Sequence, residues 1–323
     1  MKTFPIKVEK ATPMNFKFVN WKIHNVCNLN CSFCGVQHKD GSNRWFTPDQ
    51  YKEYTDKIIK AAAGEKIWIQ INGGEPTLYP DLINLLAYIK SQGAYTILTS
   101  NGTRTIRWWN ELKEAKVLDQ LFLTYHSEQF PNYRHFSEVV NLFHDEPVSV
   151  LSLITHDKTS IDQAFIAYNH LQQNTGVRVL LKAMDIYDYD IYSLYSPEQL
   201  EFLKKGSDIG QLAGKVESTV PIDFRLNSSL RVINNIREEK IVESEQLKKD
   251  QENCFLGWEC ALGHKTLRID YDKVYLGVCE VGGYQKLSDT ISFSTTPEIC
   301  PRRNCPCSFD LLSTKTLPIR NSP

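Results

Sequence analysis

The chain has 323 residues, of which 41% are hydrophobic and 11% aromatic. This content suffices for a sizeable folded core and excludes an intrinsically disordered protein. With 37 basic and 38 acidic residues the formal net charge is −1, so no global field recruits nucleic acid or an anionic membrane. The longest apolar runs are strand-sized, and we therefore expect no membrane-spanning segment.

The start of the chain, Met-Lys-Thr-Phe-Pro, contains no apolar signal segment. We therefore expect a reducing, cytoplasmic compartment, in which disulfides rarely persist. The chain has 9 cysteines, an odd number, concentrated near its two ends. This distribution suits metal ligation better than paired bridges.

Three cysteines lie in a short loop that follows an expected strand, residues 18–24. Cys27, Cys31 and Cys34 are separated by three and then two residues. Thiols this close repel one another as thiolates unless a metal holds them. Taken alone, the triplet leaves two metal sites open: an iron–sulfur cluster, or zinc with His38 completing a set of three cysteines and one histidine.

A second motif follows the next expected strand, residues 66–72. Gly73 and Gly74 let a backbone come close to a ligand, and the Glu75 carboxylate is placed to meet an ammonium group. Pro76 ends the motif. On its own, Gly-Gly-Glu-Pro is equally compatible with an ordinary strand-to-helix loop.

The rest of the first two thirds of the chain alternates between strand and helix patterns. Strands are expected at 95–99, 121–125, 148–154 and 177–183, and helices at 47–63, 81–92, around Trp108, around Val139, at 160–173 and at 197–212. Such alternation indicates an α/β fold with a parallel sheet and helices outside it. In parallel α/β barrels the chemistry gathers at the carboxyl ends of the strands, where both motifs above are found.

Polar side chains at the ends of the later strands are candidates for the substrate side. They are Tyr125, His126, Ser152, Lys182 and Asp185. His126 is the best candidate for an acid, a base or a hydrogen-bond donor, and Lys182 for an anchor of a substrate carboxylate. An ordinary structural role at a strand end remains open for each of them.

Residues 216–252 are rich in charge, and we interpret them as a solvated, helical bridge. Beyond them lie six cysteines: Cys254, Cys260, Cys279, Cys300, Cys305 and Cys307. A β-hairpin is expected at 267–277, between Cys260 and Cys279. Six thiols exceed the four that one iron–sulfur cluster needs and fall short of eight for two, and zinc is again an alternative.

The cysteine triplet, with Phe33 before its third cysteine, and the later Gly-Gly-Glu-Pro together resemble the radical S-adenosylmethionine (radical SAM) superfamily. The resemblance implies that the triplet holds a 4Fe-4S cluster with one open iron, which binds the amino and carboxylate groups of S-adenosylmethionine. It implies further cofactor contacts at Phe33, Gly73, Gly74, Glu75, Pro76, Ser100 and Asn101. Phe33 would touch the adenine and the glycines with Glu75 the methionine ammonium. Ser100 and Asn101 would form the turn at the ribose, although both residues also cap helices well.

The resemblance also implies a partial (β/α)6 TIM-like barrel over residues 1–215, followed by the bridge at 216–252. The layout of residues 253–323 resembles the auxiliary-cluster extensions called SPASM or Twitch, and so implies one auxiliary 4Fe-4S cluster in a small domain. Cys260 and Cys279 are the surest ligands. Cys254, Cys300, Cys305 and Cys307 compete for the other positions, and a leftover thiol is a candidate hydrogen donor.

The expected function is therefore that of a radical SAM enzyme. Its partners would be a peptide or small-metabolite substrate and an electron donor such as flavodoxin or ferredoxin; no membrane partner is expected, and nucleic acid is disfavoured. Only 26 residues precede Cys27, too few for a separate amino-terminal peptide-recognition domain. Two alternatives stay open: a zinc-stabilised α/β binding protein without catalysis, and a nucleic-acid-modifying radical SAM enzyme, for which no basic, aromatic-rich strip is evident.

Overall fold

The structure, a computed structural model, describes residues 3–146, 148–154, 158–175, 177–183, 195–201, 229–305 and 308–318. The chain forms two compact units. The terminal unit comprises Met1–Asn20, Glu53–Trp68 and Pro221–Pro323, and the central unit comprises Trp21–Lys52 and Ile69–Val220. The beginning and the end of the chain therefore fold together.

Six strands that are neighbours in the order of the sequence lie side by side in one sheet. They are β2 (Lys17–Lys22), β3 (Ile67–Asn72), β4 (Tyr95–Ser100), β5 (Gln120–His126), β6 (Val148–Ile154) and β7 (Arg178–Ala183), and β4 to β7 lie wholly in the central unit. Parallel pairing joins β4 to β5, β5 to β6 and β6 to β7. Within the described ranges β2 and β7 do not pair, so the sheet is open. The α/β class is thus confirmed, and the partial barrel stays a prediction.

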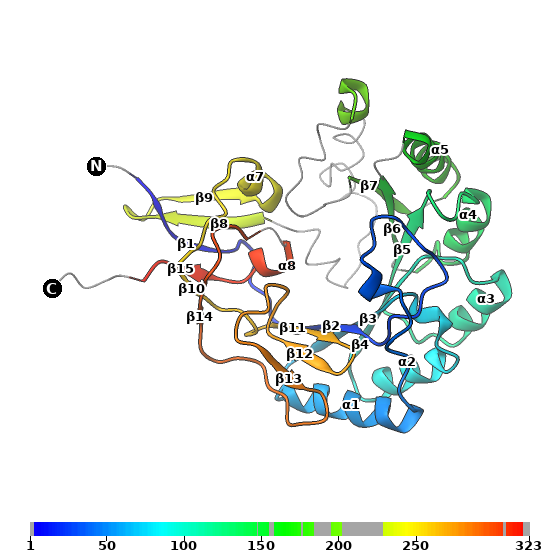
Figure 1. Cartoon of the computed structure of the whole chain (residues 1–323), viewed down its shortest axis with the longest axis horizontal. Coiled ribbons are helices and arrows are strands. Elements are labelled where there is room, and N and C mark those ends of the chain that lie inside the picture. Colours follow the sequence, from blue (N-terminus) through cyan, green and yellow to red (C-terminus); the bar gives the residue numbers. More distant parts are fainter. Residues whose placement is uncertain are drawn as a thin grey trace. The chain divides into compact units, whose positions relative to one another are not determined.

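Helices connect these strands and lie on the outer side of the sheet (Figure 1). They are α2 (Leu82–Ser91), α3 (Ile106–Glu114), α4 (Tyr133–Leu142) and α5 (Lys158–Asn174). In α2 the residues Leu82, Leu85, Leu86 and Ile89 are buried, at the spacing of one helical face. Helix α3 begins where Thr105 accepts a hydrogen bond from the Trp108 amide. The predicted alternation of strands and helices is therefore confirmed.

Antiparallel strands dominate the terminal unit. One sheet has the order β14 (Glu298–Ile299), β10 (Glu259–Cys260), β15 (Lys315–Thr316), β1 (Pro5–Lys10), β8 (Ser229–Asn234) and β9 (Glu239–Glu243). Strands β11 (Thr266–Asp270) and β12 (Lys273–Tyr275) form the predicted hairpin, and β13 (Tyr284–Lys286) pairs with β12. The short helix α8 (Ser308–Leu311) and α1 (Pro48–Ala61), which ends in this unit, complete the elements used below.

The prediction of a helical bridge at 216–252 is wrong for its described part. Residues 229–234 and 239–243 are the antiparallel strands β8 and β9, and only α7 (Ser244–Lys249) is helical. Leu230 and Val232 are buried at alternate positions of β8, as a strand requires. The charged residues of the exposed edge strand β9 hid this periodicity in the sequence. The helix expected at 197–212 is described only at 197–201, which are helical.

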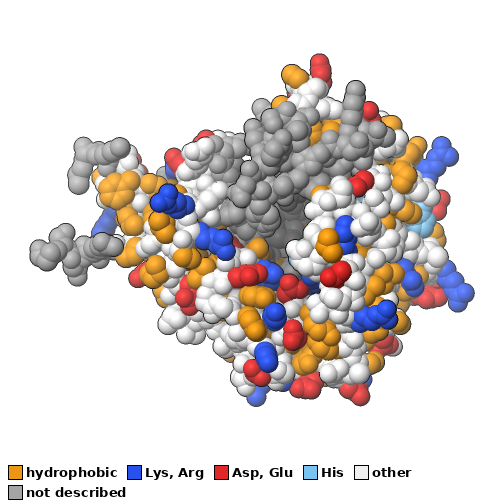
Figure 2. All heavy atoms as spheres, in the orientation of Figure 1, with side chains coloured by type: hydrophobic (Ala, Val, Ile, Leu, Met, Phe, Trp, Pro, Cys, Tyr) orange, Lys and Arg blue, Asp and Glu red, His pale blue; other side chains and the backbone are white. Residues whose placement is uncertain are grey.

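The surface agrees with the balanced composition. On the face shown in Figure 2, basic and acidic side chains are interspersed rather than gathered into patches of one sign. Among the described residues, no helix combines the length and the apolar character that a bilayer crossing requires.

Candidate active site

The cysteine loop and the carboxyl ends of β3, β4 and β5 surround one hollow of the central unit. It contains about 540 Å³ of empty space and opens to solvent. The predicted residues in its wall are Cys27, Cys31, Phe33, Cys34, Gly73, Gly74, Glu75, Ser100, Asn101 and His126. Leu29, Asn72, Thr99 and Thr124 complete the wall and were not predicted. Three motifs that are distant in the sequence therefore meet at one place.

The three thiols of the triplet lie close enough to influence one another. Burial is the main cause that raises the pKa of Cys27, with Glu75 and Cys34 adding to it. Burial, followed by the charges of Glu128 and the other two cysteines, raises the pKa of Cys31 to about 12. Thiolates are therefore costly here unless a bound cation compensates them.

The spacing of these groups bears on the choice of metal. Within the ranges described above, no three His, Cys, Asp or Glu side chains stand close enough together to hold one metal ion. His38, the fourth ligand of the zinc alternative, has Nδ1 3.1 Å from Lys22 Nζ and Nε2 3.4 Å from Gln37 Nε2. The triplet supplies three thiolates, which suit an iron–sulfur cluster, whereas a structural zinc site takes four protein ligands.

Backbone hydrogen bonds join the cysteine loop to the Gly-Gly turn. The Gly74 amide donates to His24 O at 2.9 Å, and the Glu75 amide donates to Val26 O at 2.8 Å. A Cβ on Gly73 would lie 2.7 Å from His24 O, and one on Gly74 would approach Val26 O more closely still. The observed close approach is therefore to the chain's own backbone, which explains the glycines without a ligand.

The Glu75 side chain is buried and links the turns after β3 and β4. Its Oε1 accepts hydrogen bonds from Thr77 N, Thr77 Oγ1 and Ser100 Oγ at 3.1, 2.6 and 2.8 Å. Its Oε2 accepts one from Asn101 N at 2.7 Å. Burial raises the pKa of Glu75, and these donors oppose the rise. With one donor among these contacts, Oε2 keeps an acceptor position for a cation.

Asn28, inside the cysteine loop, attaches that loop to the turn after β4. Asn101 Nδ2 donates to Asn28 Oδ1 at 3.0 Å, and Asn28 Nδ2 donates to Thr103 Oγ1 at 2.8 Å. The Thr103 amide in turn donates to Asn101 Oδ1 at 3.1 Å. Sequence reasoning missed Asn28 and Thr103; their only signal was their position within the two motifs.

His126 ends β5 and faces the hollow together with Thr124. Its Nδ1 lies 3.5 Å from Cys31 Sγ, and its ring stacks on Phe33 with centroids 5.9 Å apart. Burial lowers the pKa of His126 to about 4. Tyr125 points to the opposite side of the sheet, where it is buried against Phe136, because side chains alternate along a strand. The expectation that Tyr125 faces the substrate side is therefore wrong.

The other predicted residues of this unit are less informative. Pro76 is buried at the start of the short helix η2 (Pro76–Leu78) and does not line the hollow. Lys182 lies on β7, paired with Leu153 of β6. The side chains of Lys182 and Ser152, and all of Asp185, lie outside the described residues.

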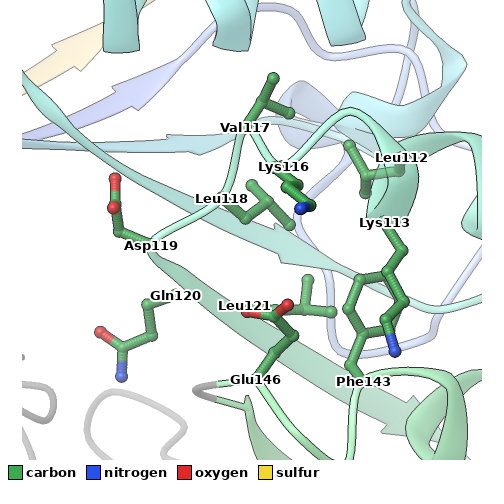
Figure 3. A pocket seen from close by; sticks show the side chains of 10 residues that line it. All are labelled: Leu112, Lys113, Lys116, Val117, Leu118, Asp119, Gln120, Leu121, Phe143 and Glu146. Atoms are coloured by element: carbon green, nitrogen blue, oxygen red, sulfur yellow. The ribbon is translucent and has the colours of Figure 1, made fainter.

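A second pocket lies at the opposite, amino end of β5 (Figure 3). It contains about 320 Å³ of empty space and is lined by residues such as Leu121, Phe143 and Lys113, with none of the predicted site residues. In parallel α/β folds this end of the strands usually serves stability rather than chemistry.

Among the described cysteines of the terminal unit, Cys260 lies near two others. Cys260 interacts electrostatically with Cys279 and Cys300. Burial raises the pKa of Cys260 and, assisted by Asp310, raises that of Cys279 to about 12. The buried Asp310 accepts hydrogen bonds from Val278 N at 2.9 Å and Cys279 N at 2.6 Å, and so fixes the backbone at Cys279.

The remaining cysteines differ in exposure. Cys254 is exposed, whereas Cys305 is buried. The Cys305 amide donates to Asn253 O at 3.0 Å, which brings its backbone beside the residue that precedes Cys254. Cys307 lies outside the described residues. Which thiols join Cys260 and Cys279 as ligands stays a prediction.

Comparison with known proteins agrees with this site. Residues 21–128 match the model of the radical SAM superfamily. The chain is 31% identical over 100 residues to a probable GTP 3',8-cyclase of Pyrobaculum aerophilum, covering 30% of this chain and 31% of that protein. It is 32% identical over 108 residues to the Fe-coproporphyrin III synthase of Methanosarcina barkeri, covering 33% and 25%. The match thus spans less than a third of either relative.

The fold resembles that of Streptococcus suis SuiB, solved bound to its precursor peptide SuiA. The two share 15% sequence identity with a TM-score of 0.53, over 86% of this chain and 64% of that one. The family match covers the cysteine triplet, the Gly-Gly-Glu-Pro turn, Asn101 and His126, the same residues that surround the hollow. The segment that carries the cysteine triplet and the Gly-Gly-Glu-Pro turn is therefore similar to the radical SAM superfamily, and the fold is similar to that of SuiB.

Proposed function

We propose that the chain cleaves S-adenosylmethionine reductively and abstracts a hydrogen atom from a peptide or small-metabolite substrate. The convergence of three thiols, the Glu75 carboxylate and the turn after β4 on one hollow carries this proposal. When bound, a reduced 4Fe-4S cluster and S-adenosylmethionine supply a 5'-deoxyadenosyl radical, which takes the hydrogen atom.

The wall of the hollow offers a role for each predicted residue. Cys27, Cys31 and Cys34 would hold the cluster as thiolates, whose cost the bound iron offsets. Oε2 of Glu75 would accept from the methionine ammonium, because among the described residues the Asn101 amide is its single donor and leaves one acceptor position.

The aromatic pair Phe33 and His126 would form one side of the nucleoside site, and Ser100 with Asn101 the other. His126 is neutral near pH 7 because its pKa is about 4, so it would act as a hydrogen-bonding group rather than as a cation. Lys182 remains our candidate anchor for a substrate carboxylate.

For the substrate we favour a peptide. SuiB, the similar fold described above, is solved with a precursor peptide. A small metabolite is the second candidate, because two relatives of partly similar sequence are named for GTP and Fe-coproporphyrin III. A nucleic-acid substrate finds no support on the face in Figure 2, where charges of both signs alternate.

We further propose that the cysteine-rich C-terminal segment holds one auxiliary 4Fe-4S cluster. Cys260, Cys279 and Cys300 form the interacting core, and a fourth ligand would come from Cys254, Cys305 or Cys307. Such a cluster suits the removal of an electron from a substrate radical, which gives dehydrogenation or a cross-link. A spare thiol that donates hydrogen would give epimerisation instead. A flavodoxin or ferredoxin would supply the first electron.

Anaerobic reconstitution with iron and sulfide tests this proposal. We expect iron and sulfide in the wild type, and 5'-deoxyadenosine after addition of dithionite and S-adenosylmethionine. Cys34→Ala should abolish that product, while Glu111→Gln, on the exposed face of α3, should not. Candidate peptides and metabolites are then compared by how much each increases the formation of 5'-deoxyadenosine. Zinc without sulfide in the wild type would replace the proposal by a zinc-stabilised binding protein.

A further inference from the structure

Two side chains of opposite charge, Glu128 and Lys39, form hydrogen bonds to the backbone of the cysteine loop at Ser32 and Cys31. From the turn after β5, the Glu128 carboxylate accepts the Ser32 amide at 3.0 Å through Oε1 and at 3.2 Å through Oε2. Glu128 Oε2 also accepts Ser32 Oγ at 3.1 Å. From the other side, Lys39 Nζ donates to Cys31 O at 2.5 Å.

The backbone holds both charged residues in place. The turn that carries Glu128 is closed by the amides of Gln129 and Phe130, which donate to His126 O at 3.2 and 2.9 Å. Lys39 directly follows the short helix η1 (Val36–His38), and its amide donates to Val36 O at 3.0 Å. Both side chains are half-buried, which limits the screening of their charges by solvent.

Both charges lie next to Cys31. Glu128 holds the amide of the following residue, Ser32, and Lys39 holds the carbonyl oxygen of Cys31 itself. The same contacts also decide which donors reach a bound cluster, because Glu128 occupies the Ser32 amide between Cys31 and Cys34.

The reduction potential of an iron–sulfur cluster depends on nearby charge and on hydrogen bonds to its sulfur atoms. A negative charge disfavours the added electron, and the loss of an amide donor does the same. A positive charge favours the added electron. Glu128 and Lys39 therefore act on this quantity in opposite directions.

We propose that Glu128 and Lys39 are opposed positioning residues that set the reduction potential of the cluster held by Cys27, Cys31 and Cys34. The inference rests on the proposed function. Glu128 makes the reduced cluster a stronger electron donor to S-adenosylmethionine, and Lys39 keeps that cluster within reach of its own reductant. Neither residue needs to touch the substrate.

The test is a redox titration of the reconstituted full chain, followed by electron paramagnetic resonance at fixed ionic strength. Glu128→Gln keeps an acceptor for Ser32 but removes the charge, so its midpoint potential should shift to a more positive value. Lys39→Gln keeps a donor for Cys31 O and should shift the midpoint to a more negative value. Glu111→Gln on α3 and Lys90→Gln on α2 are matched controls that should leave it unchanged.

A second readout separates charge from support of the loop. Ser32→Ala removes only the hydroxyl donor to Glu128, so its midpoint should stay close to that of the wild type. Opposite shifts in the two charge variants, with iron content retained, support the proposal. Midpoint potentials that equal that of the wild type in both variants overturn it. Loss of iron in Glu128→Gln together with an unchanged midpoint in Lys39→Gln also overturns it, because Glu128 then only stabilises the conformation of the cysteine loop. A wild type that binds no cluster would instead defeat the proposed function itself.

Discussion

The chain has two groups of cysteines, the triplet Cys27, Cys31 and Cys34 and the later group of the terminal unit, and the two groups are built differently. Each group contains a buried cysteine, Cys31 in the first and Cys260 in the second, and in each group burial raises the pKa of one thiol to about 12, that of Cys31 and that of Cys279. In each, a carboxylate holds a backbone amide at or beside that cysteine: Glu128 at Ser32, and Asp310 at Cys279. The difference lies in where the thiols come from.

In the first group the three cysteines occupy one loop, which is attached to the turns after β3, β4 and β5 and faces a hollow. In the second, the cysteines come from separate segments: Cys260 ends β10, Cys300 follows β14, which pairs with β10, and the Cys279 amide is held by Asp310. The first arrangement presents donors to a space that a ligand can enter. The second depends on the tertiary assembly of the terminal unit, which suits a structural or electron-transfer role.

The largest expected effect comes from removing one thiol in each group. Cys31→Ser should abolish formation of 5'-deoxyadenosine, because this thiol lies in the wall of the hollow. Cys279→Ser should lose part of the bound iron and retain cleavage of S-adenosylmethionine in the absence of substrate. Iron content and product are measured on the same preparations. Equal loss of cleavage in both variants would mean that the two groups do not act separately.

The glycines beside the two groups give the next effect. Gly74→Ala places a methyl group against the Val26 backbone and should lower the free energy of unfolding by about 1–3 kcal/mol. In Gly277→Ala the methyl group meets side-chain atoms, Asp310 Oδ1 and Leu262 Cδ1, each at 2.5 Å, and these can move. We expect the smaller loss there. Urea unfolding followed by tryptophan fluorescence provides both values, and the reverse order would contradict the backbone argument.

A third comparison concerns the carboxylate of the second group. Asp310→Asn removes the charge and one of the two acceptors for Val278 N and Cys279 N, and hydrogen bonds to charged groups contribute about 1.5–3 kcal/mol. We expect a loss of about 2 kcal/mol in the free energy of unfolding and weaker retention of iron by the second group. Cleavage of S-adenosylmethionine should stay at the wild-type rate. A slower rate would show that Asp310 acts beyond the terminal unit.

The smallest effect is a pH dependence confined to the central unit. His24 is fully buried at the end of β2, and burial lowers its pKa from 6.5 to about 4. The pKa of His24 is lower in the folded state than in the unfolded state. The contribution of neutral His24 to the free energy of unfolding is therefore fully present above pH 6.5 and is lost as the pH falls toward 4. Between pH 7 and 5.5 we expect a loss of about 1 kcal/mol. Urea unfolding at both pH values should show a flatter response in His24→Gln, and an identical slope would refute the assignment.

Local patterns were sufficient for the fold of the central unit. The strand at 148–154 is found as predicted, and α2 ends near Gly93 because this glycine has a φ of 83°. Sequence patterns did not predict the strand β9, because its charged residues hide the alternation of buried and exposed positions. They also gave the wrong side of the sheet for Tyr125. The contacts of Glu128 with Ser32 and of Asn28 with Asn101 join distant segments, so no local signal could reveal them.

The ring of hydrogen bonds among Asn28, Asn101 and Thr103 bears on how the cysteine loop binds a ligand. These bonds join protein groups only, and they restrain the cysteine loop through side chains other than its thiols. Part of the ordering entropy of the loop is therefore lost when the polypeptide folds. A ligand held by the three thiols would have less of the chain left to order when it binds, which favours its binding.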